Sequence, residues 1–339
     1  MAGRRGEKEL TLRSANAPFG QHGWTIEPSY LEAIASAFGA GLRLVDYSSD
    51  AEAARKTIND WVSDQTAKRI PMLLGPPDVT PVTRLVLVNA IYLKAQWMEW
   101  FHEDLTRPAP FARLDGSTVD VPMMRRSGGQ SIPYARGSGW QATELRYRGP
   151  DGSQPLAMTL VLPEDLVEFE AGLSASDLDA ITGALADQRA AQAQLRDCEN
   201  PDEPPRDDAG CYPYSLVLSM PRFGIDTRAQ MTDVLTVLGM PLAFDPNGAD
   251  FTAIHAPQSS AGQLFIATVI HQANIDVDEK GTEAAAATAV GMDTGGGPSA
   301  TEQITLRLDR PFLFFLRDVE TGAVLFMGRV TDPSVRSAN

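Results

Sequence analysis

The sequence contains few cysteines, few histidines and no long apolar run. Among its 339 residues are two cysteines and four histidines. No run of about eighteen apolar residues is present, so no segment is expected to span a bilayer. Basic residues are also scarce, with 29 Lys and Arg against 44 Asp and Glu and a formal net charge of −15. This balance argues against a nucleic acid or an anionic membrane as the partner, because both attract clustered positive charge.

The residues that catalysis usually requires do not form a recognisable motif. The histidines are His22, His102, His255 and His271. They stand without a Gly-x-Ser-x-Gly elbow, a His-Glu-x-x-His helix, a phosphate-binding loop or paired metal-ligating cysteines. Isolated histidines are far more often surface or core residues than catalytic bases. We therefore expect a protein that is not an enzyme and that uses neither a metal nor a cofactor.

The chain is long enough to bury a large core in one domain or two, since 43% of its residues are hydrophobic. Between about residues 186 and 212 the composition shifts to Gln, Arg, Asp, Glu and Pro, which is typical of a solvated, inserted loop. Cys198 and Cys211 lie in this insertion. No third or fourth metal ligand accompanies them, so the alternatives are a disulfide or two free thiols, and we favour the disulfide.

Hydrophobic periodicity predicts a mixture of helices and strands. Apolar positions at helical spacing predict helices at residues 28–39, 49–66, 166–185 and 231–239. Alternating or β-branched runs predict strands at residues 10–16, 83–94, 119–124, 140–147, 156–162, 215–223 and 264–275, with a C-terminal hairpin of 306–316 and 324–330. The nearly continuous apolar character of residues 83–94 indicates a strand that is buried on both faces.

A run of small residues follows the strand predicted at residues 264–275. Counted at a period of two, one face is formed by Thr282, Ala284, Ala286, Thr288 and Val290, none of which is charged or large. On composition alone, four consecutive alanines favour a short helix in a surface connection. The alternative is a segment that can slip between two existing strands, because small side chains meet little steric resistance.

Two stretches resemble the serpins, a family of protease inhibitors. Residues 279–287 (EKGTEAAAA) resemble the reactive-loop hinge of inhibitory members, and the C-terminal hairpin matches the family signature almost residue for residue. The resemblance covers residues 10–333. It implies a single α+β domain over residues 1–339 with three β-sheets, surrounding helices and an exposed reactive loop at about 279–304. It also implies that the N-terminal helices of the fold are missing, including the helix beneath the main sheet.

The resemblance assigns roles to particular residues. Asn89 and His271 match the pair that holds the main sheet shut, while Trp97 and Arg222 match a tryptophan and a basic residue beside the base of the hinge. Without the resemblance, Asn89 is explained as an ordinary buried hydrogen-bonding group and Arg222 as a solvated surface charge. The hinge itself comprises Glu279, Gly281, Thr282, Glu283, Ala284, Ala285, Ala286 and Ala287.

The position of the reactive bond differs between two ways of counting. Counting forward from the hinge gives Gly295–Gly296, and counting back from the C-terminal strand gives Ala300–Thr301. Residues 291–301 contain no Lys or Arg, so a trypsin-like target protease is disfavoured. Met292, Thr294 and Ala300 suit the small or apolar pockets of elastase-like or subtilisin-like serine proteases.

The resemblance implies a suicide substrate. A serine protease becomes acylated at the loop, and the freed hinge enters the main sheet as a new strand. The alternatives are a non-inhibitory serpin-fold binding protein and an inactive truncated serpin. We expect a monomer, and an extracellular location on the basis of the family and the favoured disulfide, while residues 1–10 show no apolar signal core.

Overall fold

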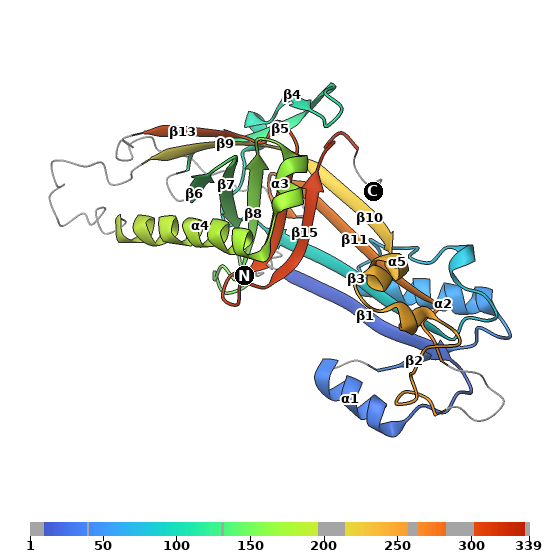
Figure 1. Ribbon diagram of the computed structural model, residues 1–339. Helices are drawn as coiled ribbons and strands as arrows, with labels where there is room; N and C mark the ends of the chain where they lie inside the picture. The colour runs from blue at the N-terminus through green and yellow to red at the C-terminus, as the bar shows by residue number, and fades with distance from the viewer. Residues whose placement is uncertain are drawn as a thin grey trace, which may run out of the picture. The chain divides into compact units, whose positions relative to one another are not determined.

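The structure, a computed structural model, describes residues 10–38, 41–129, 132–195, 214–256, 264–282 and 302–335. These residues belong to two compact units, and most of their helices and strands are labelled in Figure 1. The N-terminal unit consists of Thr11–Leu93 and Ile225–Ile275. The C-terminal unit consists of Lys94–Gly224 and Asp276–Asn339, together with residues 1–10.

Strands of the N-terminal unit form a sheet in the order β10-β11-β3-β1-β2. Strands β3 and β11 pair directly in parallel, from Val86 opposite Thr268 to Tyr92 opposite Asn274. Strands β1 and β2 are also parallel, with Phe19 opposite Arg43. The strand bounds are β1 (Thr11–Gln21), β2 (Arg43–Val45), β3 (Leu85–Gln96), β10 (Phe223–Gln230) and β11 (Thr268–Asp278). The last three residues of β3 and of β11 and the first two of β10 belong to the C-terminal unit.

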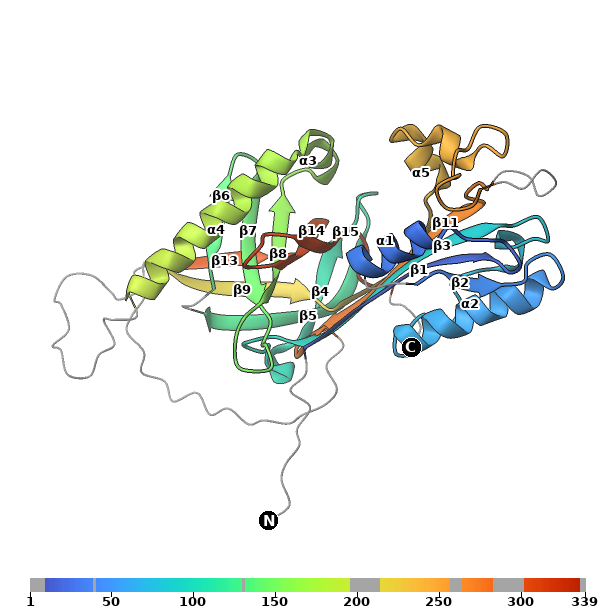
Figure 2. The ribbon, with the colours of Figure 1, turned by 90° about the horizontal axis from the view of Figure 1, so that it is seen from below.

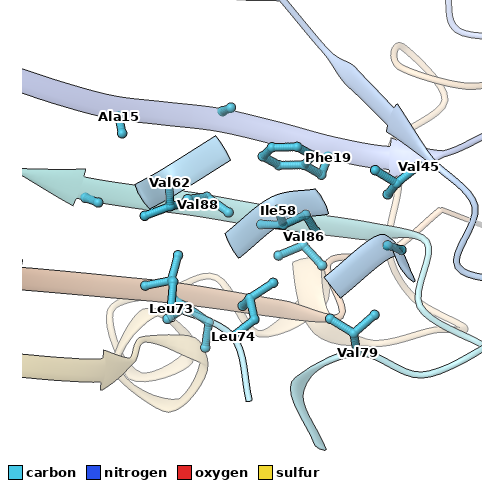
Figure 3. Close-up of a cluster of buried hydrophobic side chains, with 14 of the residues drawn as sticks. Ala15, Phe19, Val45, Ile58, Val62, Leu73, Leu74, Val79, Val86 and Val88 are labelled. Carbon is cyan, nitrogen blue, oxygen red and sulfur yellow. The ribbon is translucent and has the colours of Figure 1, made fainter. Parts of the chain in front are cut away.

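Helix α2 (Ala51–Gln65) packs along one face of this sheet, beside β1, β2 and β3 in Figure 2. The helix begins after Asp50, whose carboxylate accepts a hydrogen bond from the Ala53 amide at 2.9 Å and so satisfies a free donor of the first turn. Its buried face meets the sheet in a core cluster that contains Phe19, Ile58, Val62, Val86 and Val88 (Figure 3). The other helices of this unit are α1 (Pro28–Phe38), α5 (Thr232–Val237), η1 (Pro76–Asp78) and η4 (Pro241–Phe244).

The burial of β3 corrects one expectation from the sequence. Val86, Val88 and Ala90 are buried, whereas the alternate residues Leu87 and Asn89 are only half-buried. On that second face Leu85 and Leu93 are buried, so the prediction that this strand is buried on both faces holds at its two ends but not in its middle. Its outward positions carry apolar side chains too, which removed the alternation that normally identifies a half-exposed strand.

The C-terminal unit contains two further sheets, with strand orders β13-β9-β5-β4 and β15-β14-β8-β7-β6. All eight residues of β8 are buried, and Phe223 packs against Phe312 and Phe314 with ring centroids 5.8 and 5.5 Å apart. The strands are β4 (Arg107–Ala112), β5 (Thr118–Gly129), β6 (Tyr134–Gly137), β7 (Trp140–Arg146), β8 (Leu156–Pro163), β9 (Ser215–Pro221), β13 (Gln303–Arg307), β14 (Phe312–Asp318) and β15 (Val324–Val330).

The C-terminal hairpin of β14 and β15 is confirmed, with Phe312 opposite Val330. The strand predicted at residues 306–316, however, is interrupted. Its first part belongs to β13, which pairs with β9, and its second part is β14, which pairs with β8 and β15. Pro311 separates the two parts, because proline has no N–H to donate to a strand ladder.

The helix predicted at residues 166–185 is likewise two helices, α3 (Leu166–Gly172) and α4 (Ala175–Leu195). Ser174 starts the second one. Its hydroxyl accepts from the Asp177 amide at 3.3 Å, and the Asp177 carboxylate accepts from the Ser174 amide at 2.8 Å. Since α4 continues to Leu195, the start of the insertion predicted at 186–212 is helical, and Gln192 is buried. Cys198 and Cys211 lie outside the described residues.

No helix among the described residues is both long enough and apolar enough to cross a membrane. The C-terminal unit also contains the short helix η2 (Glu103–Leu105) and the two-residue strand β12 (Gly281–Thr282). Strand β12 follows β11 after a two-residue turn and contains Gly281 and Thr282 of the predicted hinge.

Candidate functional site

The base of the hinge is a tight turn that joins β11 to β12. The Asp278 side chain closes the turn, because its Oδ1 accepts hydrogen bonds from the amides of Lys280 at 2.8 Å and Gly281 at 3.2 Å. Burial raises the pKa of the Asp278 carboxyl. After the turn, Asp278 lies opposite Gly281 and Val277 opposite Thr282, so the chain reverses within two residues.

Gly281 is the residue that permits this reversal. Its φ is +147°, and a Cβ at this position would lie 2.1 Å from the carbonyl oxygen of Ala95 and 2.8 Å from the Cα of Gln96. Both are backbone atoms of β3, and they could move away only if the strand itself were displaced. Only glycine fits such a close approach of two strands.

Strand β12 has a neighbour on each side. It pairs in antiparallel fashion with β11 through Val277 and Thr282, and with β3 through Ala95 opposite Thr282 and Gln96 opposite Gly281. These residues all belong to the C-terminal unit. The first residues of the hinge are therefore already a central strand, between β11 and β3.

Glu279 is a buried residue held by an ion pair with the partly exposed Arg222. Its side chain is only 3% exposed, and its two carboxylate oxygens accept hydrogen bonds from the Arg222 Nε at 2.8 and 2.9 Å. The Thr106 hydroxyl donates a third bond at 2.5 Å. Burial, the largest single influence, raises the pKa of Glu279, but the hydrogen bonds from Arg222 and Thr106 outweigh it and leave the pKa below its usual value.

Trp97 bonds to the backbone of the turn, and Tyr147 bonds to the side chain of Thr282, the second residue of β12. The Trp97 amide donates to the Lys280 carbonyl at 2.8 Å, and its indole Nε1 donates to the Asp278 carbonyl at 3.0 Å. The Trp97 ring stacks on Tyr147, with centroids 4.4 Å apart and planes inclined by 21°. The Tyr147 hydroxyl is 2.8 Å from the Thr282 hydroxyl, and both residues are fully buried.

A second group of predicted residues lies in the N-terminal unit. Asn89 on β3 and His271 on β11 are opposite each other in the parallel register. The His271 Nδ1 is hydrogen-bonded to the Asn89 Oδ1, and the Asn89 amide donates to the Asn16 Oδ1 on β1. Burial lowers the pKa of His271. This chain of polar groups connects three neighbouring strands.

The structure thus brings together Trp97, Arg222 and Glu279 in one unit, and Asn89 with His271 in the other. The sequence did not identify Asn16, Thr106 or Tyr147 as members of these groups. Asn16 and Tyr147 stand in segments predicted as strands, and only the register shows what they face. Outside the described residues lie Glu283, Ala284, Ala285, Ala286 and Ala287 of the hinge, and Met292, Thr294, Gly295, Gly296, Ala300 and Thr301 of the loop.

No arrangement in these groups provides a nucleophile with an adjacent base. Across the described ranges, no group of three or more His, Cys, Asp and Glu side chains is close enough to hold a metal ion. What the first group does is hold a short strand in place through one ion pair, one buried hydroxyl pair and two bonds from a tryptophan. The contacts of this group fix the position of β12.

Comparison with known proteins identifies the fold and the family. A family model described as "Serpin (serine protease inhibitor)" matches residues 3–333. An uncharacterized serpin-like protein of Thermococcus kodakarensis is 33% identical over 95% of this chain, which spans 66% of that protein's length. A leukocyte elastase inhibitor of Bos taurus is 32% identical over 95% of this chain and 78% of its own length. The expectation that the chain is not an enzyme is confirmed, since members of this family are inhibitors.

Solved structures show the same fold. The structure of Serpin48 from the insect Tenebrio molitor superposes with a TM-score of 0.72 at 25% identity, covering 97% of this chain and 78% of that one. Uncleaved ovalbumin, at 23% identity, shares the fold with a TM-score of 0.73 over 97% of this chain and 76% of its own. The predicted α+β fold with three β-sheets is thereby confirmed. The chain belongs to the serpin family.

Proposed function

We propose that this serpin inhibits a serine protease as a suicide substrate. The protease's serine attacks a carbonyl in the loop that connects β12 to β13, the amine side of the bond leaves, and an acyl-enzyme ester forms. The hinge, now free at its C-terminal end, extends β12 between β3 and β11. The observation that carries the proposal is that β12 already pairs with both of these strands.

Insertion requires β3 and β11 to give up their direct pairing. Seven residue pairs connect them, from Val86 and Thr268 to Tyr92 and Asn274. A strand inserted between them restores a ladder on both of its edges, so the sheet gains one row of backbone hydrogen bonds. Asn89 and His271 are cross-strand neighbours in the part that must open, which supports the role that the resemblance gives them.

The side chains of the hinge suit this movement. After Thr282, the positions of the same face are Ala284, Ala286 and Thr288, which offer little bulk to the residues that line the opening. A charged side chain on this face would have to be desolvated during insertion, at a cost of several kcal/mol. Insertion must also be faster than hydrolysis of the acyl-enzyme, and small uncharged residues favour rapid insertion.

The proposed target is an elastase-like or subtilisin-like protease rather than a trypsin-like one. Residues 291–301 contain no Lys or Arg, and they offer small or apolar residues at the predicted reactive bond. Several relatives at 31–34% identity are named leukocyte elastase inhibitors. We further propose a monomer that acts outside the cell, on the basis of the family and of the disulfide favoured between Cys198 and Cys211.

Incubation with pancreatic elastase and with subtilisin tests the proposal. We expect a covalent complex that survives SDS gel electrophoresis, and mass spectrometry of the released peptide should place the cut within residues 291–301. The variant Ala286→Arg should be cleaved at the same bond without forming the complex. The matched control is Ala323→Arg, at an exposed position outside the hinge, which should still form it.

Cleavage of the unaltered protein without any complex would identify a substrate rather than an inhibitor. The melting temperature of the cleaved chain decides the same point independently. A cleaved chain that melts no higher than the intact one has gained no strand, and the proposed mechanism would then be wrong.

A further inference from the structure

A cavity of about 490 Å³ lies in the C-terminal unit, at residues that take no part in the hinge site. Three elements surround it, β6, α4 and β13, which are labelled in Figure 1. The lining residues that matter for the argument are Tyr134 and Arg136 from β6, Ala184 from α4, Tyr214, Glu302 directly before β13, and Ile304 on β13. Cavities of this size hold small organic molecules in other proteins.

The floor of the cavity is formed by two tyrosine rings whose own polar atoms are already occupied, and Gln188 of α4 adds a polar side chain to the lining. Tyr134 and Tyr214 are buried, with their rings edge to face at a centroid distance of 6.2 Å. The Tyr214 hydroxyl accepts from the Tyr134 amide at 2.8 Å, and the Tyr134 hydroxyl donates to Gln141 at 3.0 Å. With these bonds made, the two residues offer a ligand the accessible part of each ring, which is small because Tyr134 is 9% and Tyr214 6% exposed.

The rim carries two opposite charges. Arg136 and Glu302 are both exposed, and neither forms an ion pair with any other residue that the structure describes. Burial raises the pKa of the Tyr134 hydroxyl, while Arg136 lowers it and Glu302 raises it. Both charges therefore lie within electrostatic reach of the same phenol at the cavity floor.

We propose that this cavity binds a free aromatic α-amino acid. The ring of the ligand packs on Tyr134 and Tyr214, against the apolar walls formed by Ala184 and Ile304. Its carboxylate pairs with Arg136 and its ammonium group with Glu302. The site is independent of the proposed inhibition, because it uses no hinge residue and requires no protease.

The charges on the rim select this chemistry over related ligands. An uncharged aromatic compound would leave both Arg136 and Glu302 without a partner. An aromatic carboxylate would bring a negative charge close to Glu302, and an aromatic amine would bring a positive charge close to Arg136. A zwitterion attached to an aromatic ring satisfies both charges at once and fills the apolar floor.

Isothermal titration of the full chain with L-phenylalanine tests the proposal, with three analogues that each lack one feature. These are 3-phenylpropionate without the ammonium group, 2-phenylethylamine without the carboxylate, and L-alanine without the ring. We expect saturable binding of phenylalanine and binding of each analogue weaker by about tenfold, a factor typical for the loss of one good contact.

Variants assign the contacts. Glu302→Gln should weaken the binding of phenylalanine but leave the affinity for 3-phenylpropionate unchanged or higher. Arg136→Gln should also weaken the binding of phenylalanine but leave the affinity for 2-phenylethylamine unchanged or higher. Arg307→Gln is the matched control, because this arginine is on β13 but pairs with Asp309 and should change nothing. Ala184→Trp should fill the cavity and abolish binding, with thermal unfolding used to show that the variant is folded.

Three results would overturn the proposal. The first is no saturable binding of phenylalanine, L-tyrosine or L-tryptophan. The second is equal affinity for phenylalanine and all three analogues, which would indicate an unselective cavity. The third is binding that persists in a folded Ala184→Trp variant, which would place the ligand elsewhere. None of these results depends on whether the protein inhibits a protease.

Discussion

The Arg222 guanidinium lies against both oxygens of the Glu279 carboxylate, at Nε–O distances of 2.8 and 2.9 Å. Glu279 is almost completely buried, whereas the side chain of Arg222 remains 32% exposed. The pair therefore connects a residue at the surface to the first turn of the hinge. The pair holds the turn that leads into β12.

Removal of the arginine should destabilise the protein. Among the described residues, Arg222→Met leaves the buried Glu279 carboxylate with Thr106 as its one remaining side-chain donor. We expect a loss of about 1–3 kcal/mol in the free energy of unfolding at pH 7. Because the pKa of Glu279 is lowered in the folded state, the contribution of the pair is complete above the ordinary glutamate pKa of about 4.3. It should disappear as the pH falls through the lower folded value.

Urea unfolding at pH 7 and in acid measures this difference. Arg329→Met is the matched control, because Arg329 pairs with Glu170 at the surface with 58% of its side chain exposed. A loss of less than about 1 kcal/mol is expected there. Equal losses in the two variants, or a loss at Arg222 that grows in acid, would contradict the assigned pair.

Substitution of Gly281 should detach β12. Gly281→Ala places a Cβ against the backbone of Ala95, in addition to the strain of its positive φ, so we expect a cost of about 3 kcal/mol or more if β12 stays in place. The strand can avoid this cost by leaving the sheet. Hydrogen exchange of the Trp97 amide, which donates to the Lys280 carbonyl, should then become fast.

Gly322→Ala separates the clash from the strain. Gly322 has a φ of +75°, but a Cβ added there would meet no atom within 4 Å beyond the two adjoining residues. About 1–2 kcal/mol is expected for the left-handed conformation alone, and the Trp97 amide should remain protected. A Gly281→Ala variant that behaves like Gly322→Ala would show that β12 and β3 are not in such close contact.

The hydroxyl pair of Tyr147 and Thr282 should show strong coupling. Tyr147→Phe keeps the ring that stacks on Trp97 but leaves the buried Thr282 hydroxyl without its partner, at an expected cost of about 1–3 kcal/mol. Thr282→Val should cost a similar amount. The double variant should be much less destabilised than the sum, because no buried polar atom then lacks a partner. Additive effects in the thermodynamic cycle would rule out a direct bond.

His271 should make stability depend on pH in the weakly acidic range. Since burial lowers its pKa, the unfolded chain takes up the proton more readily than the folded chain. Stability should therefore fall as the pH drops below about 6.5, the ordinary value for histidine. His271→Gln should remove this dependence of stability on pH. The exposed His22→Gln variant is the control, and an equal change in both would show that the Asn89–His271 contact is not its source.

The chain's local patterns were sufficient for most of the secondary structure. Helix α2 has Ala54, Ile58 and Val62 at helical spacing after an aspartate cap, and β14 with β15 carry a dense apolar signal. The errors occurred where a local pattern continued past a break, as at Pro311 and Ser174. In both places the apolar signal is the same on either side, and the break comes from a local feature, the missing N–H of Pro311 and the Ser174–Asp177 cap that starts α4.

The candidate site was predicted in part. Glu279, Arg222, Trp97, Asn89 and His271 were named from the family resemblance, and the structure brings them into two groups. The contributions of Thr106, Tyr147 and Asn16 could not be foreseen. Their residue types are common in strands and loops, and their partners lie between 73 and 173 positions away in the chain.

The sequence by itself determined most of the elements, the net negative charge and the small side chains of the hinge, because these depend on residue type and on spacing along the chain. The tertiary structure alone decided that β12 lies between β11 and β3, that Gly281 touches the backbone of β3, and that Tyr147 reaches Thr282. Such contacts depend on strand register, and register is fixed by packing between segments that are far apart in the chain.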